Sequence, residues 1–191
     1  LAAAAVGLWL ERDADEIRRA LESFRPLPMR MQVEEVGGVT LIHDAYNANP
    51  RSTVAALHEV GYRGGGGRRV AVLGDMLELG RYARALHAGV GRAAAEAHLD
   101  LLWAVGPLSE EAARAARDAG LGRVYWSPSV KEALAAPPFT PRPGDAVLFK
   151  ASRRVGLERI HDALRLELRS TERAVAAPEP GRSPELPSLR T

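Results

Sequence analysis

Residues 39 to 52 read Val-Thr-Leu-Ile-His-Asp-Ala-Tyr-Asn-Ala-Asn-Pro-Arg-Ser, and this stretch decides the fold. An apolar, β-branched run ends at Asp44, a short Asn-rich turn follows, and Pro50 then opens a helix. The pattern predicts a strand, a turn and a helix in succession, which is one repeat of an open α/β sheet. Ligands of such sheets bind at the carboxyl ends of the strands, so Asp44 stands where function is expected.

The same alternation continues along the chain from Met31. Gly37-Gly38 divides two short segments, 33–36 and 39–42, and predicts a hairpin. Further strands are expected at 69–73, 101–105, 124–126 and 146–149, and helices at 50–60, 83–97, 109–119, 130–135 and 155–168. Short strands that are apolar throughout, each separated by a helix, are typical of a parallel sheet covered on both faces. We therefore predict an α/β protein with a Rossmann-like, doubly wound, mostly parallel sheet.

The two ends of the chain differ from this central part. Helices are predicted at 1–10 and 14–24, and the prolines at 26 and 28 then form a linker and hinge. Because the chain begins inside a helical pattern and without an initiator Met, we expect residues 1–29 to be the last helices of a preceding unit plus the linker. Residues 30–169 then form the Rossmann-like domain. Residues 170–191, rich in Pro, Ser, Glu and Arg, are expected to be disordered.

Composition excludes several classes of function. The 191 residues include 26 Lys and Arg against 24 Asp and Glu, so no broad positive field is available to bind nucleic acid. The absence of cysteine removes disulfides and thiolate metal sites. The apolar run Leu1 to Leu10 is too short to span a bilayer and has no basic leader before it, so we expect a cytoplasmic protein without membrane insertion.

Polar side chains at three strand ends are candidates for a site. Asp44 could cap the following helix, but Asn49 directly precedes Pro50 and is the better cap candidate, which leaves Asp44 free for a ligand. The turn at 74–80 carries Asp75 and Glu78, either as a site or as a solvated turn. Lys150 and Ser152 close the last strand just ahead of a helix, where an anion could bind.

Other conspicuous residues have structural explanations. The glycine run 64–67 precedes a strand instead of following one, so it is predicted to be a surface connection and not a phosphate loop. His87 lies on a helix beside apolar residues and is expected to be a partly buried structural imidazole. The remaining histidines have no metal-ligand spacing, and no Ser-His-Asp arrangement emerges, so we predict neither a metal site nor a catalytic nucleophile.

Several blocks together resemble the Mur ligase family, in particular the C-terminal region of the ligases of MurF type. They are Asp44-Ala45-Tyr46-Asn47-Ala48-Asn49-Pro50, Val70-Ala71-Val72-Leu73-Gly74-Asp75-Met76-Leu77-Glu78-Leu79-Gly80, Gly106, Lys150-Ala151-Ser152-Arg153 and Gly156-Leu157-Glu158. The resemblance extends over about residues 1–168, and the order and spacing of the blocks make it specific. This type of ligase adds D-alanyl-D-alanine to UDP-N-acetylmuramoyl-tripeptide in peptidoglycan synthesis.

The resemblance implies a three-domain enzyme that works as a monomer. ATP phosphorylates the carboxylate of the tripeptide to an acyl phosphate, which the amine of D-alanyl-D-alanine then attacks. ATP and Mg²⁺ are bound mainly by a central domain, whose glycine-rich phosphate loop is not in this chain, while the C-terminal domain closes over the nucleotide and delivers the dipeptide. A chain of this extent is therefore expected to be inactive by itself.

The resemblance also implies roles for individual residues. Arg30 matches an arginine that reaches the ATP phosphates, Asp44 matches the acid that holds the ribose, and Tyr46 and Asn47 are expected near the adenine. On the same rim of one cleft, Lys150 and Ser152 correspond to the block that contacts D-alanyl-D-alanine and its carboxylate, and Asp75 and Glu78 line that cleft by position. All these groups position and stabilise charge, and none is a nucleophile.

Three departures from the family pattern limit the transfer of these roles. His43 stands where an acid is common, Ala151 where glycine is common, and Arg154 and Val155 replace Ser and Met. An alanine at a position that needs positive φ would reshape the loop that holds Ser152.

The alternatives to a MurF-type ligase domain are another Mur-type or folylpolyglutamate-type ligase domain, or a nucleotide-binding module without catalysis.

Overall fold

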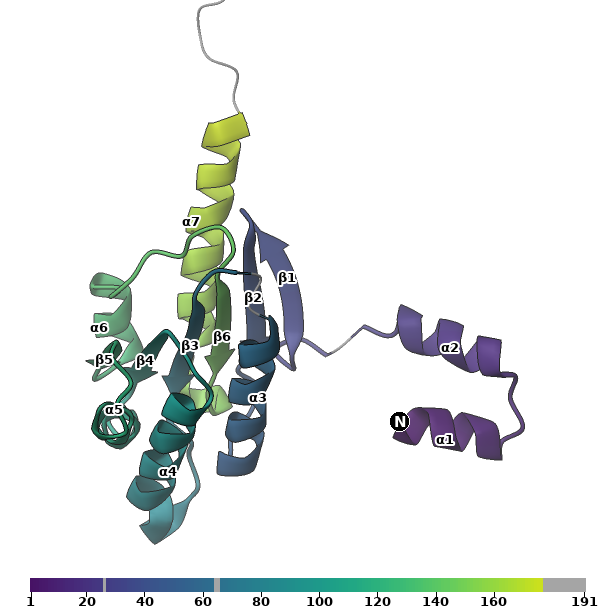
Figure 1. Cartoon of the computed structure of the whole chain (residues 1–191), viewed down its shortest axis with the longest axis horizontal. Coiled ribbons are helices and arrows are strands. Elements are labelled where there is room, and N and C mark those ends of the chain that lie inside the picture. Colours follow the sequence, from purple (N-terminus) through teal and green to yellow (C-terminus); the bar gives the residue numbers. More distant parts are fainter. Residues whose placement is uncertain (26, 64–65, 177–191) are drawn as a thin grey trace, which may run out of the picture.

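The computed structural model describes residues 1–25, 27–63 and 66–176. A six-stranded sheet lies at its centre, with the strand order β1-β2-β6-β3-β4-β5 (Figure 1). The strands are β1 (Gln32–Val36), β2 (Val39–Asp44), β3 (Arg69–Gly74), β4 (Leu101–Val105), β5 (Val124–Ser127) and β6 (Ala146–Lys150). β1 pairs with β2 in an antiparallel hairpin, and every other neighbouring pair is parallel, which confirms the predicted mostly parallel sheet.

Helices cover both faces of the sheet. One face carries α3 (Pro50–Arg63), α4 (Ala83–Glu96) and α5 (Ser109–Asp118), and the other carries α6 (Val130–Ala135) and α7 (Glu158–Ala176). Two short 3₁₀ helices, η1 (Gly80–Tyr82) and η2 (Arg153–Val155), follow the ends of β3 and β6. This arrangement confirms the doubly wound architecture predicted from the alternating pattern.

The apolar strands explain why the sheet has two cores. Successive side chains of a strand point to opposite faces. In β6, Val147 and Phe149 belong to the cluster under α6 and α7, whereas Ala146 and Leu148 belong to the cluster under α3 and α4. All four are fully buried, so both faces of this strand must be apolar. The central strands, and therefore the position of their carboxyl ends, are fixed by burial on two sides.

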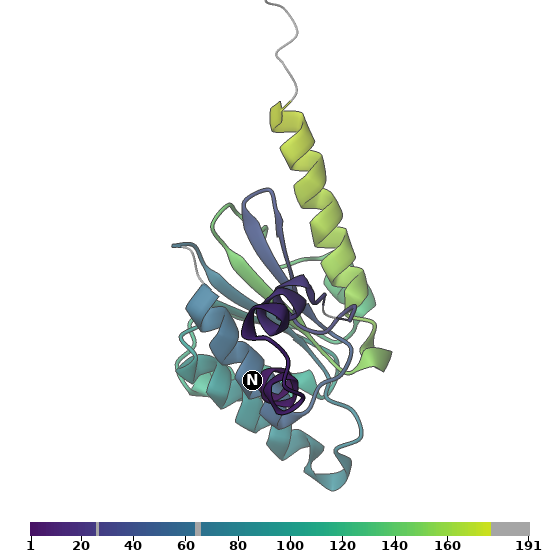
Figure 2. The same ribbon diagram turned by 90° about the vertical axis from the view of Figure 1, so that its right-hand side faces the viewer.

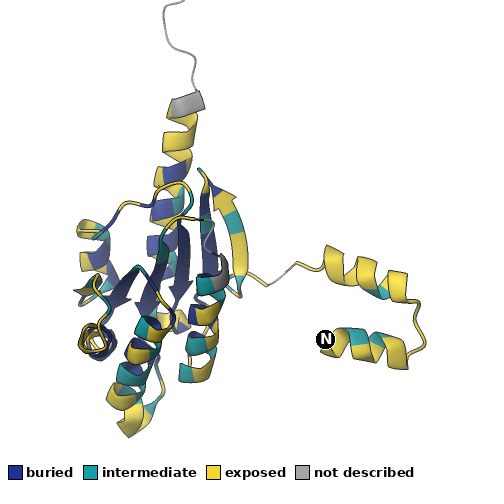
Figure 3. Ribbon diagram, in the orientation of Figure 1, coloured by how far each residue is buried: buried dark blue, intermediate teal, exposed yellow. Residues whose placement is uncertain are grey.

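The first two helices form a pair that stands apart from the sheet. α1 (Ala2–Trp9) packs against α2 (Ala14–Ser23), and residues 24–31 lead from this pair to β1 (Figure 1). The Asp13 carboxylate caps α2 by accepting from the backbone N–H groups of Asp15 and Glu16. Neither helix has a buried residue (Figure 3). Trp9 is 80% exposed. Both predicted helices are confirmed, but the pair contains no buried side chain and so has no core of its own.

The last helix is longer than the sequence pattern indicated. α7 continues to Ala176, eight residues beyond the predicted end at Leu168, and extends past the ends of the strands in both views (Figures 1 and 2). No residue from 169 to 174 is buried, whereas Leu164 and Leu168 are, so this part of the extension is not held by the core. The expected disordered segment therefore begins in a helix, and residues 177–191 lie outside the described part.

The glycine run before β3 has a packing role that the sequence pattern did not indicate. Residues 64 and 65 lie outside the described residues, but Gly66 and Gly67 form an exposed bend. A Cβ atom at Gly67 would lie 2.3 Å from the backbone of Gly144, so only glycine fits against this turn.

Among the described residues, no helix is both long enough and apolar enough to cross a bilayer.

Candidate functional site

The carboxyl ends of β2 and β6 lie side by side and bring Asp44 and Lys150 together. The two residues are paired in the parallel register, and the Lys150 ammonium donates to Asp44 Oδ2 at 2.5 Å and to the Asn47 carbonyl at 3.0 Å. Lys150 is 2% exposed. The first and last sequence blocks therefore share one rim of the sheet, as expected for a common cleft.

The linker before β1 is attached to the same rim by two backbone groups. Met31 N–H donates to Asp44 Oδ1 at 3.1 Å, and Tyr46 N–H donates to the Met29 carbonyl at 3.0 Å. Between these two bonds, the Arg30 guanidinium lies over the Tyr46 ring, 4.2 Å from its centre. Asp44 and Tyr46, two of the predicted nucleotide residues, are thus joined to the linker that carries a third, Arg30.

The turn after β2 confirms the predicted helix cap. Asn49 Oδ1 accepts from Ser52 N–H at 2.9 Å, and Asn49 N–H donates back to Ser52 Oγ at 3.3 Å, a reciprocal arrangement like a capping box. Asp44 takes no part in this cap. Asn47 uses its side-chain oxygen to accept from Ala48 N–H at 2.9 Å and is exposed at the rim together with Tyr46.

The loop after β6 is joined to the loop after β3. Ser152 Oγ accepts from Leu77 N–H at 2.9 Å, and Ser152 N–H donates to the Asp75 carbonyl at 3.0 Å. Ala151 is not among the described residues with positive φ, so alanine fits here without backbone strain. Its methyl group instead faces Gly74, where a Cβ atom would lie 2.7 Å away. The departure at Ala151 therefore leaves the Ser152 loop intact.

Asp75 and Glu78 occupy very different surroundings, although the sequence could not separate their roles. Asp75 is 4% exposed, and its carboxylate accepts from Ser109 N–H and Oγ, both at 2.7 Å, and from Leu108 N–H at 3.3 Å. This carboxylate thus caps α5 from outside the helix, and a Cβ atom at Gly106 would lie 2.5 Å from it. Asp75 is therefore neither a solvated turn residue nor open to a substrate.

Glu78 is the exposed member of that turn. It has a φ of 66° and pairs with Arg154 at 3.3 Å, with both side chains largely in solvent. Surface pairs of this kind contribute about 0–1 kcal/mol, so Glu78 is available to a ligand. Of the two acids in the turn, only Glu78 has the accessibility that a cleft-lining role demands.

Two histidines are structural, and one of them has a strongly shifted pKa. His87 Nε2 accepts from Met76 N–H at 3.0 Å, and the ring is 2% exposed, which confirms the structural imidazole predicted there. His43 stacks on His161 with 4.0 Å between ring centres. Burial, reinforced by the neighbouring His161, lowers the pKa of His43 to about 4.

Among the described residues, no group of His, Asp and Glu is arranged to hold a metal ion.

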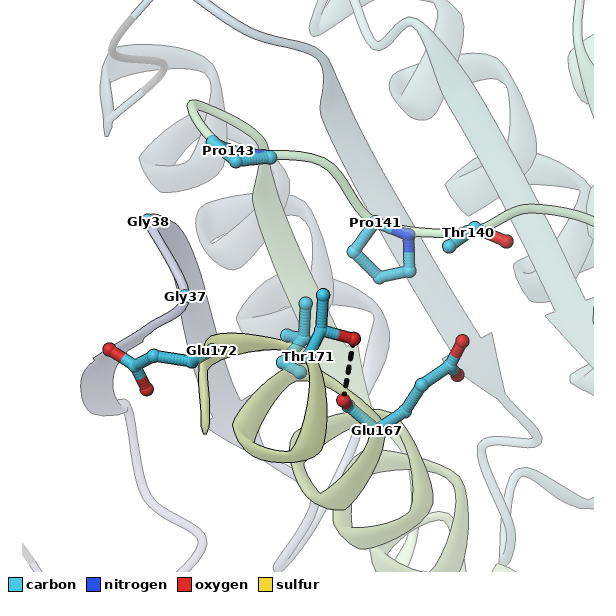
Figure 4. Close-up of a pocket in the computed structure, with 9 residues that line it drawn as sticks. Gly37, Gly38, Thr140, Pro141, Pro143, Glu167, Thr171 and Glu172 are labelled. Carbon is cyan, nitrogen blue, oxygen red and sulfur yellow. Dashed lines mark hydrogen bonds between the residues drawn. The ribbon is translucent and has the colours of Figure 1, made fainter. Parts of the chain in front are cut away.

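A cavity of about 340 Å³ lies beside the rim and combines an aromatic face with cations. The residues around it are Leu27, Pro28, Met29, Arg30, Tyr46 and Arg153. A second cavity, of about 480 Å³, lies at the opposite ends of the strands, beside the β1–β2 turn and the later part of α7 (Figure 4). That second cavity is lined mainly by apolar groups and is remote from the residues predicted to act.

The signal that sequence analysis missed is the register of β2 and β6. Lys150 was expected to face the dipeptide, but the structure places its ammonium with Asp44 and Asn47, the predicted nucleotide group. Because this ammonium is buried between two acceptors, a direct dipeptide contact is not favoured by the geometry. The Met31 amide, just before β1, and the side chain of Arg153, which stands in one of the sequence blocks, had been given no role.

A comparison with protein families decides what kind of domain this is. Residues 29–153 match the family described as "Mur ligase, glutamate ligase domain". The chain belongs to the Mur ligase family. Two curated relatives carry the name UDP-N-acetylmuramoyl-tripeptide--D-alanyl-D-alanine ligase. The Bacillus subtilis protein is 32% identical over 84% of this chain, and that of Mycobacterium tuberculosis (strain CDC 1551 / Oshkosh) is 38% identical over 86%.

A solved Mur ligase structure shows the same fold. The MurF ligase of Thermotoga maritima, crystallised in complex with ADP, matches 87% of this chain with a TM-score of 0.69 and 27% sequence identity. The match covers 37% of that chain, and the two curated relatives are covered over 35% and 36% of their lengths. This Mur ligase chain therefore spans about a third of the length of the relatives it matches.

Proposed function

We propose that this chain is the part of a MurF-type ligase that closes over ATP and delivers the dipeptide. The reaction joins D-alanyl-D-alanine to UDP-N-acetylmuramoyl-tripeptide through an acyl phosphate. The observation that carries the proposal is the shared rim of β2 and β6, where Asp44, Tyr46, Asn47 and Lys150 meet the linker that holds Arg30. The relatives named above, which are 32% and 38% identical, support this reaction over that of another Mur ligase.

The nucleotide half of the site uses Arg30, Asp44, Tyr46 and Asn47. Each Asp44 carboxylate oxygen holds one protein donor, so lone pairs are left for ribose hydroxyls. Tyr46 is exposed and offers a ring face to the adenine, and the Asn47 amide nitrogen can donate at the same edge. Arg30 leaves the Tyr46 ring and pairs with the phosphates when the domains close.

The dipeptide half of the site uses Ser152 and Glu78. Ser152 is buried as well, but its Oγ accepts from Leu77 N–H and its own proton is left to donate to a substrate carboxylate. The exposed carboxylate of Glu78 faces solvent on the same loop pair and suits the dipeptide ammonium. Asp75 acts only indirectly, since it holds the turn against α5. These groups orient two substrates for attack on an acyl phosphate and supply no nucleophile.

Mg²⁺ is assigned to no residue of this chain, because the described residues offer no cluster of oxygen and nitrogen ligands for it. We propose that the metal is held with the ATP phosphates by the central domain.

The exposed apolar side chains of α1 and α2, including Trp9, fit helices that belong to that same domain. The monomeric state and the cytoplasmic location of the enzyme stay predictions.

The test of the proposed function is a coupled assay of ADP release by the complete enzyme that contains this chain. With UDP-N-acetylmuramoyl-tripeptide, ATP and D-alanyl-D-alanine together, release is expected, and it should stop when the dipeptide is omitted. The 191-residue chain by itself should release no ADP. Release that depends on a folate and glutamate, in place of the tripeptide substrate and the dipeptide, would instead show a ligase of folylpolyglutamate type, and nucleotide binding without turnover would show a non-catalytic module.

A further inference from the structure

Lys150 has little capacity to bind a substrate directly. An ammonium group has three donors, and two of them already point at Asp44 and at the Asn47 carbonyl. The side chain is also almost completely buried. A lysine in this position acts on the residues around it, and its main partner is the carboxylate that is proposed to hold the ribose.

Asp44 connects Lys150 to the linker. One of its oxygens accepts from the ammonium at 2.5 Å and the other from Met31 N–H at 3.1 Å. A charge-assisted bond is stronger and more directional than a neutral one, so Lys150 sets the orientation of the carboxylate. Without the ammonium, we expect the carboxylate to turn toward solvent and its bond to Met31 N–H to weaken.

The linker needs this tether because its backbone is strained. Met29 and Met31 have φ values of 62° and 46°, in the left-handed region that L side chains rarely adopt. Such conformations persist only where surrounding contacts enforce them. Here Tyr46 N–H holds one side of Arg30 through the Met29 carbonyl, and Asp44 holds the other side through Met31 N–H.

We propose that Lys150 is a positioning residue for the nucleotide half of the site, acting through Asp44 on the linker that carries Arg30. This inference rests on the proposed function, because it takes Asp44 and Arg30 as contacts of ATP. It replaces the sequence-based expectation that Lys150 contacts the dipeptide. The buried ammonium of Lys150 thereby orients the Asp44 carboxylate that accepts from the ribose. Through the same carboxylate it holds the segment from which Arg30 projects toward the phosphates.

Steady-state kinetics of the complete ligase separate the two roles. In Lys150→Met, KM for ATP is expected to rise at least tenfold, while KM for D-alanyl-D-alanine changes less than twofold. In an Asp44→Asn background, Lys150→Met should change KM for ATP less than twofold further, because Lys150 acts through Asp44. Multiplicative effects of the two substitutions, or a larger rise in KM for the dipeptide, would overturn the proposal.

A second measurement keeps the test valid if Lys150→Met does not fold. Lys150→Arg keeps the charge and is expected to recover most of the ATP affinity, and Lys150→Gln keeps only a weak donor. Hydrogen exchange of the Met31 amide should accelerate at least tenfold in Lys150→Gln and stay close to wild type in Lys150→Arg, with β3 amides as internal control. Equal exchange at Met31 in all three proteins rejects the positioning role. If the wild-type enzyme releases no ADP, the proposed function is rejected. The exchange measurement then still tests whether Lys150 holds the linker at Met31.

Discussion

At the scale of single residues, burial decides how the polar groups of this chain behave. Asp75 and Glu78 are three residues apart in one turn, yet the first is buried under α5 and the second is exposed. The sequence shows two acids and no difference between them. What separates them is contact with Leu108 and Ser109, more than 30 residues away, which no local pattern reveals.

His43 gives a pH dependence of stability that can be measured. Its pKa is about 4 in the folded protein against 6.5 for an exposed histidine, mainly because of burial. Below pH 6.5 the unfolded chain binds a proton that the folded protein does not, so stability falls as the pH drops from 6.5 to 4 and then levels off. The loss from this group is about 3 kcal/mol.

Urea denaturation of wild type and His43→Phe between pH 7.5 and 4.5 checks this expectation. The Phe variant keeps a ring to stack on His161 but cannot titrate, so the free-energy gap between the two proteins should shift in favour of the variant as the pH falls. The neighbouring groups His161, Asp162, Glu158 and Glu34 are common to both proteins. A gap that is the same at every pH would contradict the assignment.

At the scale of elements, the start of α5 depends on a side chain from another loop. In Asp75→Ala, the N–H groups of Leu108 and Ser109 lose their acceptor, and the negative charge at the helix N-terminus disappears. We expect a loss of roughly 2–4 kcal/mol in the free energy of unfolding. Glu78→Ala in the same turn is the matched control and should cost less than about 0.5 kcal/mol. Similar losses in both variants, measured by urea denaturation, would show that Asp75 does not cap α5.

The elements also show which parts of the fold the sequence can predict. Periodicity and capping are local signals, so the strands, the helix that begins at Pro50 and the Asn49 cap were predicted correctly. Strand order is not local: β2 and β6 are neighbours although Asp44 and Lys150 stand 106 residues apart. The shared rim was therefore inferred from resemblance, while the Asp44–Lys150 ion pair and the tether on Met31 required the structure.

At the scale of the whole molecule, the strained linker separates two parts that differ in burial. The sheet and its covering helices bury large apolar side chains on both faces, whereas α1 and α2 bury none (Figure 3). Residues 24–31 join the two parts, and the contacts of Arg30, Asp44 and Tyr46 fix the linker where it meets the sheet. We expect closure over the nucleotide to break the contact between Arg30 and Tyr46 while the bond from Lys150 to Asp44 persists.

The most direct test is a crystal structure of the complete ligase with a non-hydrolysable ATP analogue in the closed state. We expect a ribose hydroxyl at about 3 Å from the Asp44 carboxylate, the Lys150–Asp44 pair unchanged, and the Arg30 guanidinium moved from the Tyr46 ring to the phosphates. A closed complex in which the nucleotide touches neither Asp44 nor any other residue at the ends of β2 and β6 would contradict the account.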